Sequence, residues 1–165
     1  MQRKQNKTKY KVSKNKKIAI VVSEYNSDIT FPMRDGAIEE LKVKGILEKN
    51  IKVFFAPGAF EIPIICKKIA RLSSPAGSAN GRQAKKFDGI IAIGCVIKGD
   101  TDHYVYIAGE STRGIMDVML STNIPISNAI LTVNNLEQAK LRSEGENNKG
   151  IEAAIALLKI LSLKL

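Results

Sequence analysis

The sequence predicts an α/β fold of three layers, an α/β/α sandwich in which a four-stranded parallel sheet lies between helices. Four short apolar runs alternate with amphipathic segments of helical period along the 165 residues. Strands that alternate with helices require right-handed crossovers, so they form a parallel sheet with helices on both faces. No internal repeat appears, and this length suits a single domain, which we expect over residues 17–165.

The first strand is predicted over residues 17–23, an apolar run typical of a strand buried inside a parallel sheet. A helix is expected to follow, from about Ile29 or Pro32 to Lys44, because proline fits the first turn of a helix. The apolar face of this helix is expected to comprise Met33, Ala37, Ile38, Leu41 and Val43.

The second strand is predicted over residues 51–56, where an apolar run ends in a turn that contains Gly58. A helix is expected from Glu61 to about Leu72. The segment 73–86 is small, polar and basic, and we expect it to form a flexible insertion before the third strand.

The third strand is predicted over residues 88–97, and it leads into the chain's single histidine. A polar cluster, residues 100–102, follows the strand and can cap the next helix. His103 lies in the first turn of that helix, at the strand end where ligands bind in α/β sheets. A lone histidine at a helix start is more often structural or solvated, so on the residues alone His103 is only a candidate acid or base.

The rest of the chain supplies one more strand and three helices. A long helix is expected over 102–121, a strand over 124–133, a short helix to Arg142 and a final helix over 150–162. The final helix is rich in Ala, Ile and Leu and is expected to pack on the sheet or on a neighbouring subunit. The buried residues of the long helix are expected to be Ile107, Ile115, Val118, Met119 and Leu120.

The net charge of +10 is concentrated at the N-terminus. Residues 1–17 hold eight of the 26 Lys and Arg residues and no acidic residue, so the rest of the chain nearly balances its 16 acidic residues. The basic arm, residues 1–16, is expected to be solvated and disordered. Because no basic face interleaved with aromatic residues follows it, we expect no nucleic-acid partner.

Composition also bears on the cellular compartment of the protein and on whether it binds a metal. No apolar run approaches the length of a membrane span, and the arm lacks the apolar segment of a secretory signal. Cys66 and Cys95 lie in apolar segments without metal-ligand spacing, which favours buried, reduced thiols. We therefore expect a cytoplasmic protein with no membrane partner and no metal site.

Aromatic, apolar and polar side chains gather at the predicted strand ends, and they suit a flat heteroaromatic ligand. Tyr25, Phe60 and His103 each follow a different strand. The chain has neither a P-loop nor a Gly-rich dinucleotide motif after the first strand. Phosphate binding would therefore need Arg142, Lys149 or the amides of the helix that begins near residue 101.

Several segments resemble the motifs of the 6,7-dimethyl-8-ribityllumazine synthase family, in that family's order and spacing. They are 57–63 (PGAFEIP), 94–104 (GCVIKGDTDHY), 131–133 (LTV) with 137–139 (EQA), and 148–150 (NKG). The resemblance spans roughly residues 16–160. It implies a flavodoxin-like sheet and an enzyme that condenses 5-amino-6-(D-ribitylamino)uracil with 3,4-dihydroxy-2-butanone 4-phosphate, losing phosphate and water without a metal or organic cofactor.

The resemblance also implies the residues of the site. His103 matches the proton-transfer residue, Tyr25 the ring that stacks on the pyrimidine, and Arg142 the phosphate-binding arginine. Val105 departs from the family, which commonly has an acidic residue two positions after the histidine. The full implied substrate-binding set is Tyr25, Ala59, Phe60, Glu61, Cys95, Val96, Ile97, Asp100, Thr101, Asn128, Arg142 and Lys149.

The family builds its sites between adjacent subunits of a ring of five. The resemblance therefore implies a homopentamer, leaves open an icosahedral shell of sixty subunits, and makes riboflavin synthase a candidate partner.

Two alternatives to the enzyme remain at this point: a non-catalytic flavin- or lumazine-binding protein on the same scaffold, and a nucleic-acid-binding protein. His103 and Arg142 argue against the first, because ring binding alone needs no proton shuttle beside a phosphate clamp.

Overall fold

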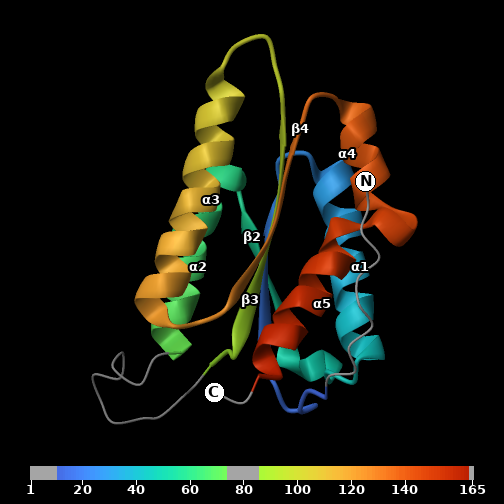
Figure 1. Ribbon diagram of the computed structural model, residues 1–165, viewed down its shortest axis with the longest axis vertical. Helices are drawn as coiled ribbons and strands as arrows, with labels where there is room; N and C mark the ends of the chain where they lie inside the picture. The colour runs from blue at the N-terminus through green and yellow to red at the C-terminus, as the bar shows by residue number, and fades with distance from the viewer. Residues whose placement is uncertain (1–10, 74–85, 164–165) are drawn as a thin grey trace.

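The computed structural model describes residues 11–73 and 86–163, and it shows the four-stranded parallel sheet that the sequence predicts (Figure 1). The strand order is β2-β1-β3-β4. The two central strands are β1 (Ile18–Ser23) and β3 (Gly89–Ile97), and the two edge strands are β2 (Ile51–Ala56) and β4 (Ile126–Val133). The expected insertion at 73–86 lies outside the described residues except for its two ends.

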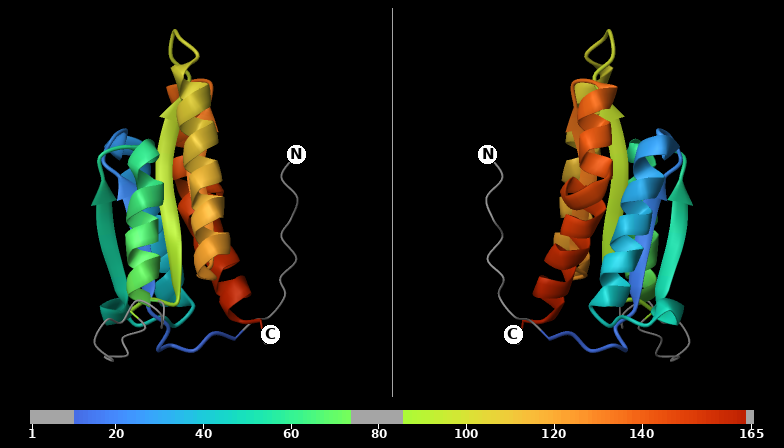
Figure 2. Two further views of the ribbon diagram at one scale, coloured as in Figure 1. Left: turned by 90° about the vertical axis from the view of Figure 1, so that its left-hand side faces the viewer. Right: turned by 90° about the vertical axis from the view of Figure 1, so that its right-hand side faces the viewer.

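Helices cover both faces of the sheet, which confirms the three-layer prediction (Figure 2). One face carries α2 (Ile62–Ser73) and α3 (His103–Thr122). The other carries α1 (Ser27–Val43), α4 (Leu136–Ser143) and α5 (Lys149–Leu161). Three short 3-10 helices complete the described elements: η1 (Glu48–Asn50), η2 (Ala59–Glu61) and η4 (Gly145–Asn147).

Burial separates the central strands from the edge strands. Every residue of β1 is buried, and in β3 all are buried except the half-buried Ile97. In β2, by contrast, Phe55 is 51% exposed and only Ala56 is buried. Strand β2 is therefore more exposed than its apolar run indicates, and β4 also alternates with exposed residues. An edge strand has a neighbour on one side only, so part of its surface remains open to solvent.

The first helix begins earlier than the sequence predicts, and of the five residues expected on its apolar face it fully buries Met33, Ala37 and Leu41. It starts at Ser27, and Pro32 lies inside it rather than in its first turn. Gly45 ends the helix in a left-handed conformation (φ 92°), and the Ile46 amide bonds to the Leu41 carbonyl. This turn buries Ile46 against the core, whereas Val43 is exposed and the prediction for it is wrong.

The long helix α3 departs from prediction at two points. Ile115 and Val118 are buried as expected, but Leu120 is 69% exposed because it lies on the face turned away from the sheet. Asp102 precedes the helix, yet its side chain accepts no hydrogen bond from the first turn. Its backbone (φ −75°, ψ 6°) is not the extended conformation that places a capping oxygen over the N-terminal amides.

The final helix packs on the sheet and on α1 rather than offering a mainly exposed apolar face. Leu157 and Leu158 are fully buried in the core between α1, α5 and the sheet. Within the described residues, no helix is long and apolar enough to span a membrane.

The chain contacts the domain before residue 17. Val12 packs partly buried against the core, and the Lys14 carbonyl accepts hydrogen bonds from the Leu47 amide and the Asn50 side chain. Lys16 pairs with Asp88 at 3.0 Å. Residues 11–16 therefore lie along the base of the domain, and the rest of the expected arm, residues 1–10, lies outside the described residues.

Candidate functional site

A cavity of about 450 Å³ opens at the carboxyl ends of β1 and β3. These strands are neighbours in the sheet, but the connections that leave them run to opposite sides, toward β2 and toward β4. Ligands of open α/β sheets bind at such a point, where the strand order reverses. Most of the predicted site residues line this first cavity: Tyr25, Ala59, Phe60, Glu61, Cys95, Val96, Ile97, Thr101 and His103.

Two aromatic rings stand exposed at the mouth of the first cavity. Tyr25 is 71% and Phe60 is 55% exposed, so neither ring belongs to the core. Tyr25 lies two residues after the end of β1, and Phe60 lies in η2 after β2. Exposed rings at a cavity mouth can stack on a flat ligand and gain area burial as they do so.

The turn that carries Tyr25 is tied to β3 by Asn26. Asn26 has a left-handed backbone (φ 57°), and its Nδ2 donates to the Cys95 carbonyl at 3.0 Å. Asn26 also lines the first cavity. The sequence places Asn26 at a strand end, but nothing in it indicates this hydrogen bond across 69 residues of chain.

His103 is exposed at the first residue of α3 and is one of the residues that line the first cavity. Its imidazole makes no hydrogen bond or ion pair with any residue of the described segments. Val105, in the position that the family commonly gives to an acid, is half exposed and offers no partner for the imidazole. Among the described residues, the imidazole therefore has no carboxylate partner.

The two cysteines are free and buried, as predicted, and neither is poised as a nucleophile. Burial raises the pKa of the Cys95 thiol to about 11 and that of Cys66 to about 12. Because the thiolate is the nucleophilic form, Cys95 contributes apolar surface to the first cavity rather than covalent chemistry. Asp100, also a predicted site residue, is exposed and does not line this cavity.

The remaining predicted residues lie elsewhere, in a second cavity of about 400 Å³ between β4 and α5. Asn128 comes from β4, Arg142 from the last turn of α4, and Lys149 from the first residue of α5. Figure 1 looks onto this side of the molecule, with β4 between α3 and α5. The structure therefore separates the predicted phosphate residues from His103 within one chain.

Both cations of the second cavity already have protein partners. Arg142 Nη1 donates to the Gln138 carbonyl at 2.9 Å, which leaves its other guanidinium donors for a ligand. Lys149 pairs with Glu152, which lines the same cavity. Asn128 turns its Oδ1 back to the Ile130 amide on its own strand, at 2.9 Å.

Sequence reasoning missed several residues of these cavities. Tyr104 and Ile107 line the first cavity from α3, and Glu152 and Ser127 line the second. The spacing of Lys149 and Glu152, three residues apart, is a signal that could have found the ion pair. Among the described residues, no group of three His, Cys, Asp or Glu side chains is placed to hold a metal ion.

The comparisons with known proteins decide the family. The model of the 6,7-dimethyl-8-ribityllumazine synthase family matches residues 15–164. The chain belongs to this family. It is also similar to a 6,7-dimethyl-8-ribityllumazine synthase of Leuconostoc mesenteroides, with 43% identity over 150 residues, which are 90% of this chain and 88% of the relative.

Membership confirms the resemblance on which the sequence analysis ended. The predicted activity, lumazine synthesis in riboflavin biosynthesis, is that of the family. The interpretations as a binding protein or a nucleic-acid-binding protein have no such support, and the chain is an enzyme.

Proposed function

We propose that this lumazine synthase joins its two substrates at a site composed of the first cavity of one copy and the second cavity of a neighbouring copy. The observation that carries this proposal is the separation of His103 from Arg142 and Lys149 into different cavities of one chain. A heterologous contact that repeats around a ring would bring one cavity of each type together at every interface.

The first cavity suits 5-amino-6-(D-ribitylamino)uracil. Tyr25 and Phe60 can cover the flat ring, and Val96 and Ile97 add apolar surface beneath it. The Glu61 carboxylate lies within the same cavity, close over the turn at Gly58, and can accept hydrogen bonds from ribityl hydroxyls.

His103 would transfer protons as the substrates condense. The 5-amino group of the pyrimidine attacks the ketone of 3,4-dihydroxy-2-butanone 4-phosphate, and water leaves from the carbinolamine as the imine forms. An imidazole can take the proton from nitrogen and return one to the departing hydroxyl. Its exposure and freedom from carboxylate partners leave it able to reach a ligand.

Arg142 and Lys149 would hold the phosphate of the second substrate. A guanidinium binds phosphate through paired hydrogen bonds, and an ammonium adds charge at the same point. Both groups also stabilise inorganic phosphate as it leaves later in the reaction. Holding the two substrates together should supply much of the acceleration, because it replaces an encounter in solution.

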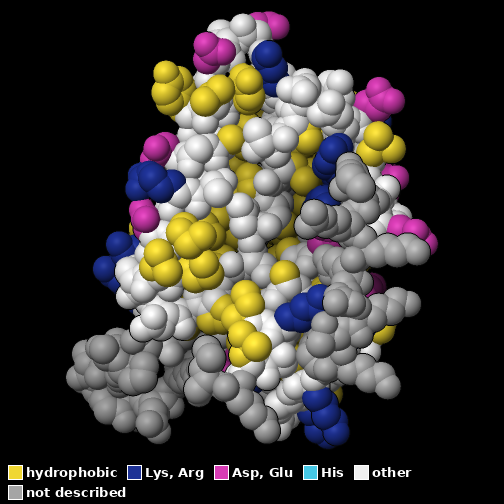
Figure 3. All heavy atoms as spheres, viewed as in Figure 1, with side chains coloured by type: hydrophobic (Ala, Val, Ile, Leu, Met, Phe, Trp, Pro, Cys, Tyr) yellow, Lys and Arg dark blue, Asp and Glu magenta, His cyan; other side chains and the backbone are white. Residues whose placement is uncertain are grey.

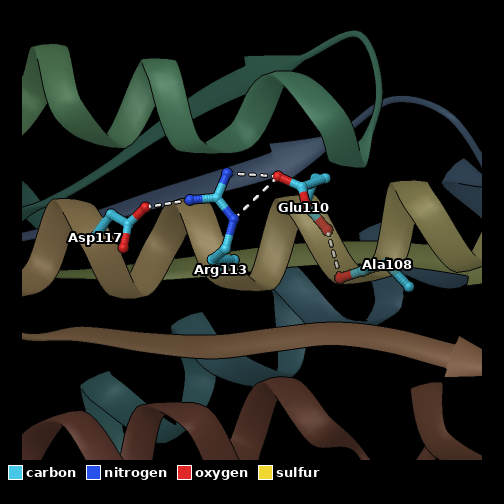
Figure 4. A network of polar contacts seen from close by, with 5 residues as sticks. Ala108, Glu110, Arg113 and Asp117 are labelled. Atoms are coloured by element: carbon cyan, nitrogen blue, oxygen red, sulfur yellow. Dashed lines mark hydrogen bonds and ion pairs between the residues drawn. The ribbon is translucent and has the colours of Figure 1, made fainter.

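Exposed apolar side chains on α3 support assembly. Figure 3 shows hydrophobic side chains gathered on α3 and between the helix layers on this face. On one exposed side of α3, Tyr106 lies near the start of the helix and Leu120 near its end. Between them Arg113 bridges Glu110 and Asp117, and its hydrogen bonds lower the pKa of the Glu110 carboxyl (Figure 4).

We assign this surface to a homopentamer of the family type. A shell of sixty subunits and an association with riboflavin synthase are further options that this surface leaves open. Light scattering tests the assembly: an active 18.1 kDa monomer would contradict the shared site. We also place the enzyme in the cytoplasm, in keeping with its two free thiols.

Complementation between variants is the sharper test of the shared site. His103→Ala and Arg142→Ala chains, each less active alone than the wild type, are expressed together so that mixed rings form. If each site takes one residue from each copy, random mixing restores about a quarter of the wild-type sites. Activity of the mixture that stays at the sum of the separate variants, while wild type turns over, would contradict it.

A further inference from the structure

Asn148 is 4% exposed and stands directly before α5, in the connection from α4. Its side chain uses every hydrogen-bonding position that an amide has. Nδ2 donates to the Ser143 carbonyl at 2.6 Å and to the Pro32 carbonyl at 3.0 Å. Oδ1 accepts from the Gly150 amide at 2.8 Å and from the Ile151 amide at 3.3 Å.

These four bonds join three helices through one side chain. Ser143 is the last residue of α4, Pro32 lies in α1, and Gly150 and Ile151 form the first turn of α5. The Oδ1 atom alone would be enough to cap the helix, and the side-chain oxygen of an aspartate or serine often has this role. The two donations by Nδ2 are the additional feature, because they fix α5 against both α4 and α1.

Packing leaves the amide no alternative position. A Cβ at Gly36 of α1 would lie 2.6 Å from Asn148 Nδ2, and a Cβ at Gly150 would lie 1.8 Å from the Met33 carbonyl oxygen. Both positions therefore need glycine, and α1 and the start of α5 cross at close range. The side chain of Asn148 fills the space that Gly36 leaves open.

The hydrogen bonds of Asn148, which form a junction between α1, α4 and α5, lie between the two cations of the second cavity along the chain. Arg142 immediately precedes Ser143, and Lys149 immediately follows Asn148, so the hydrogen bonds hold both ends of the short connection that separates the two cations. Asn148 itself does not line the cavity. We propose that Asn148 is a positioning residue that sets the placement of Arg142 relative to Lys149, and so the affinity for the phosphorylated substrate.

This inference rests on the proposed function, in which the second cavity binds the phosphate. Asn148→Asp keeps the shape and the capping oxygen but sets a carboxylate oxygen against two carbonyl oxygens. We expect the KM for 3,4-dihydroxy-2-butanone 4-phosphate to rise about tenfold or more, and the KM for the pyrimidine to change less than about twofold, because displaced binding groups lose affinity steeply.

Ser73→Ala is the matched control. Ser73 is also buried, and its hydroxyl donates to the Ile69 carbonyl and accepts from the Phe87 amide, on the opposite face of the sheet. It should lower the melting temperature without a selective effect on either KM.

A further readout is the double variant. Once Arg142→Ala has removed the phosphate-binding guanidinium, Asn148→Asp should add little to the KM for the phosphorylated substrate.

Gly36→Ala provides a second route if Asn148→Asp does not fold. Its methyl group pushes on the Asn148 amide while every proposed binding residue stays in place, and the same selective rise in KM is expected. Equal rises for both substrates, as for a general loss of stability, would overturn the inference, as would unchanged KM values in a folded variant.

Inorganic phosphate separates failure of this inference from failure of the proposed function. If the wild type binds phosphate but shows no turnover, only the proposed reaction is overturned, and the loss of phosphate binding in Asn148→Asp still supports the positioning role. If the wild type turns over and Asn148→Asp binds phosphate as the wild type does, only the positioning role is overturned. A wild type with neither property would overturn both.

Discussion

Lys149 donates hydrogen bonds to both carboxylate oxygens of Glu152, at 2.7 Å each, in the cavity that also contains Arg142. A phosphate that binds there must share or replace this carboxylate. The pair is partly exposed, so its own contribution to folding stability is small, but its effect on an incoming dianion is direct.

Glu152→Gln should therefore tighten binding of the phosphorylated substrate. Removing the carboxylate frees Lys149 and removes a negative charge near the phosphate, so we expect a KM lower by roughly threefold, an effect that salt reduces. Glu39→Gln on α1 is the control, since Glu39 pairs with Lys42 at the same three-residue spacing and the change alters net charge equally away from the second cavity. A raised KM would mean instead that Glu152 holds Lys149 in its binding position.

His103→Ala should slow turnover by about ten- to a thousand-fold while substrate binding persists. Proximity and the phosphate clamp survive the change, so activity is reduced rather than abolished. Single-turnover kinetics measures the chemical step, and equilibrium binding of the pyrimidine serves as the control. A variant with the wild-type single-turnover rate would reduce His103 to a structural residue.

Tyr25→Ala should weaken binding of the pyrimidine by about 1–2 kcal/mol, through lost stacking and lost area burial. Calorimetry with a non-reactive ribitylated pyrimidine measures this. The KM for the phosphorylated substrate is the internal control and should not change. Unaltered affinity for the pyrimidine would show that the ring does not face the ligand.

Arg142→Ala should have the converse effect and weaken mainly the phosphorylated substrate. Arg142→Lys keeps the charge but loses the paired donors, so it should recover only part of the affinity. Competition by inorganic phosphate provides the measurement. Equal loss of affinity for both substrates would point to collapse of the cavity rather than loss of a clamp.

Deleting residues 1–10 should leave activity and assembly unchanged, because this stretch is rich in Lys and Arg and holds few apolar residues to bury. The deletion ends before Val12, which packs against the core, and before Lys16, which pairs with Asp88. Turnover and light scattering compare the two forms. A soluble but inactive truncation would show that the arm contributes to a site.

The sequence predicted the central strands better than the edges. Continuous apolar runs identify β1 and β3, but the strand order, which leaves Phe55 on an open edge, depends on long-range pairing. Helical period failed at Val43 and Leu120 because it does not show where a helix turns away from the core.

The residues of the candidate site could likewise be predicted from the sequence only in part. Topology alone brought Tyr25, Phe60 and His103 to one end of the sheet. Arg142 and Lys149 came from resemblance to the family. Asn148 was missed as a junction because its partners lie in three helices, and local sequence indicates only its helix cap.

The two buried thiols can serve as probes of local opening of the structure. Because burial raises the pKa of both thiols far above neutrality, both are protonated at neutral pH, and alkylation by iodoacetamide requires the chain to open locally. Cys66 lies in α2 and Cys95 beside the first cavity. The two alkylation rates, read by mass spectrometry, would therefore time the opening of a helix and of a substrate pocket separately. Only the second should slow when the pyrimidine is bound.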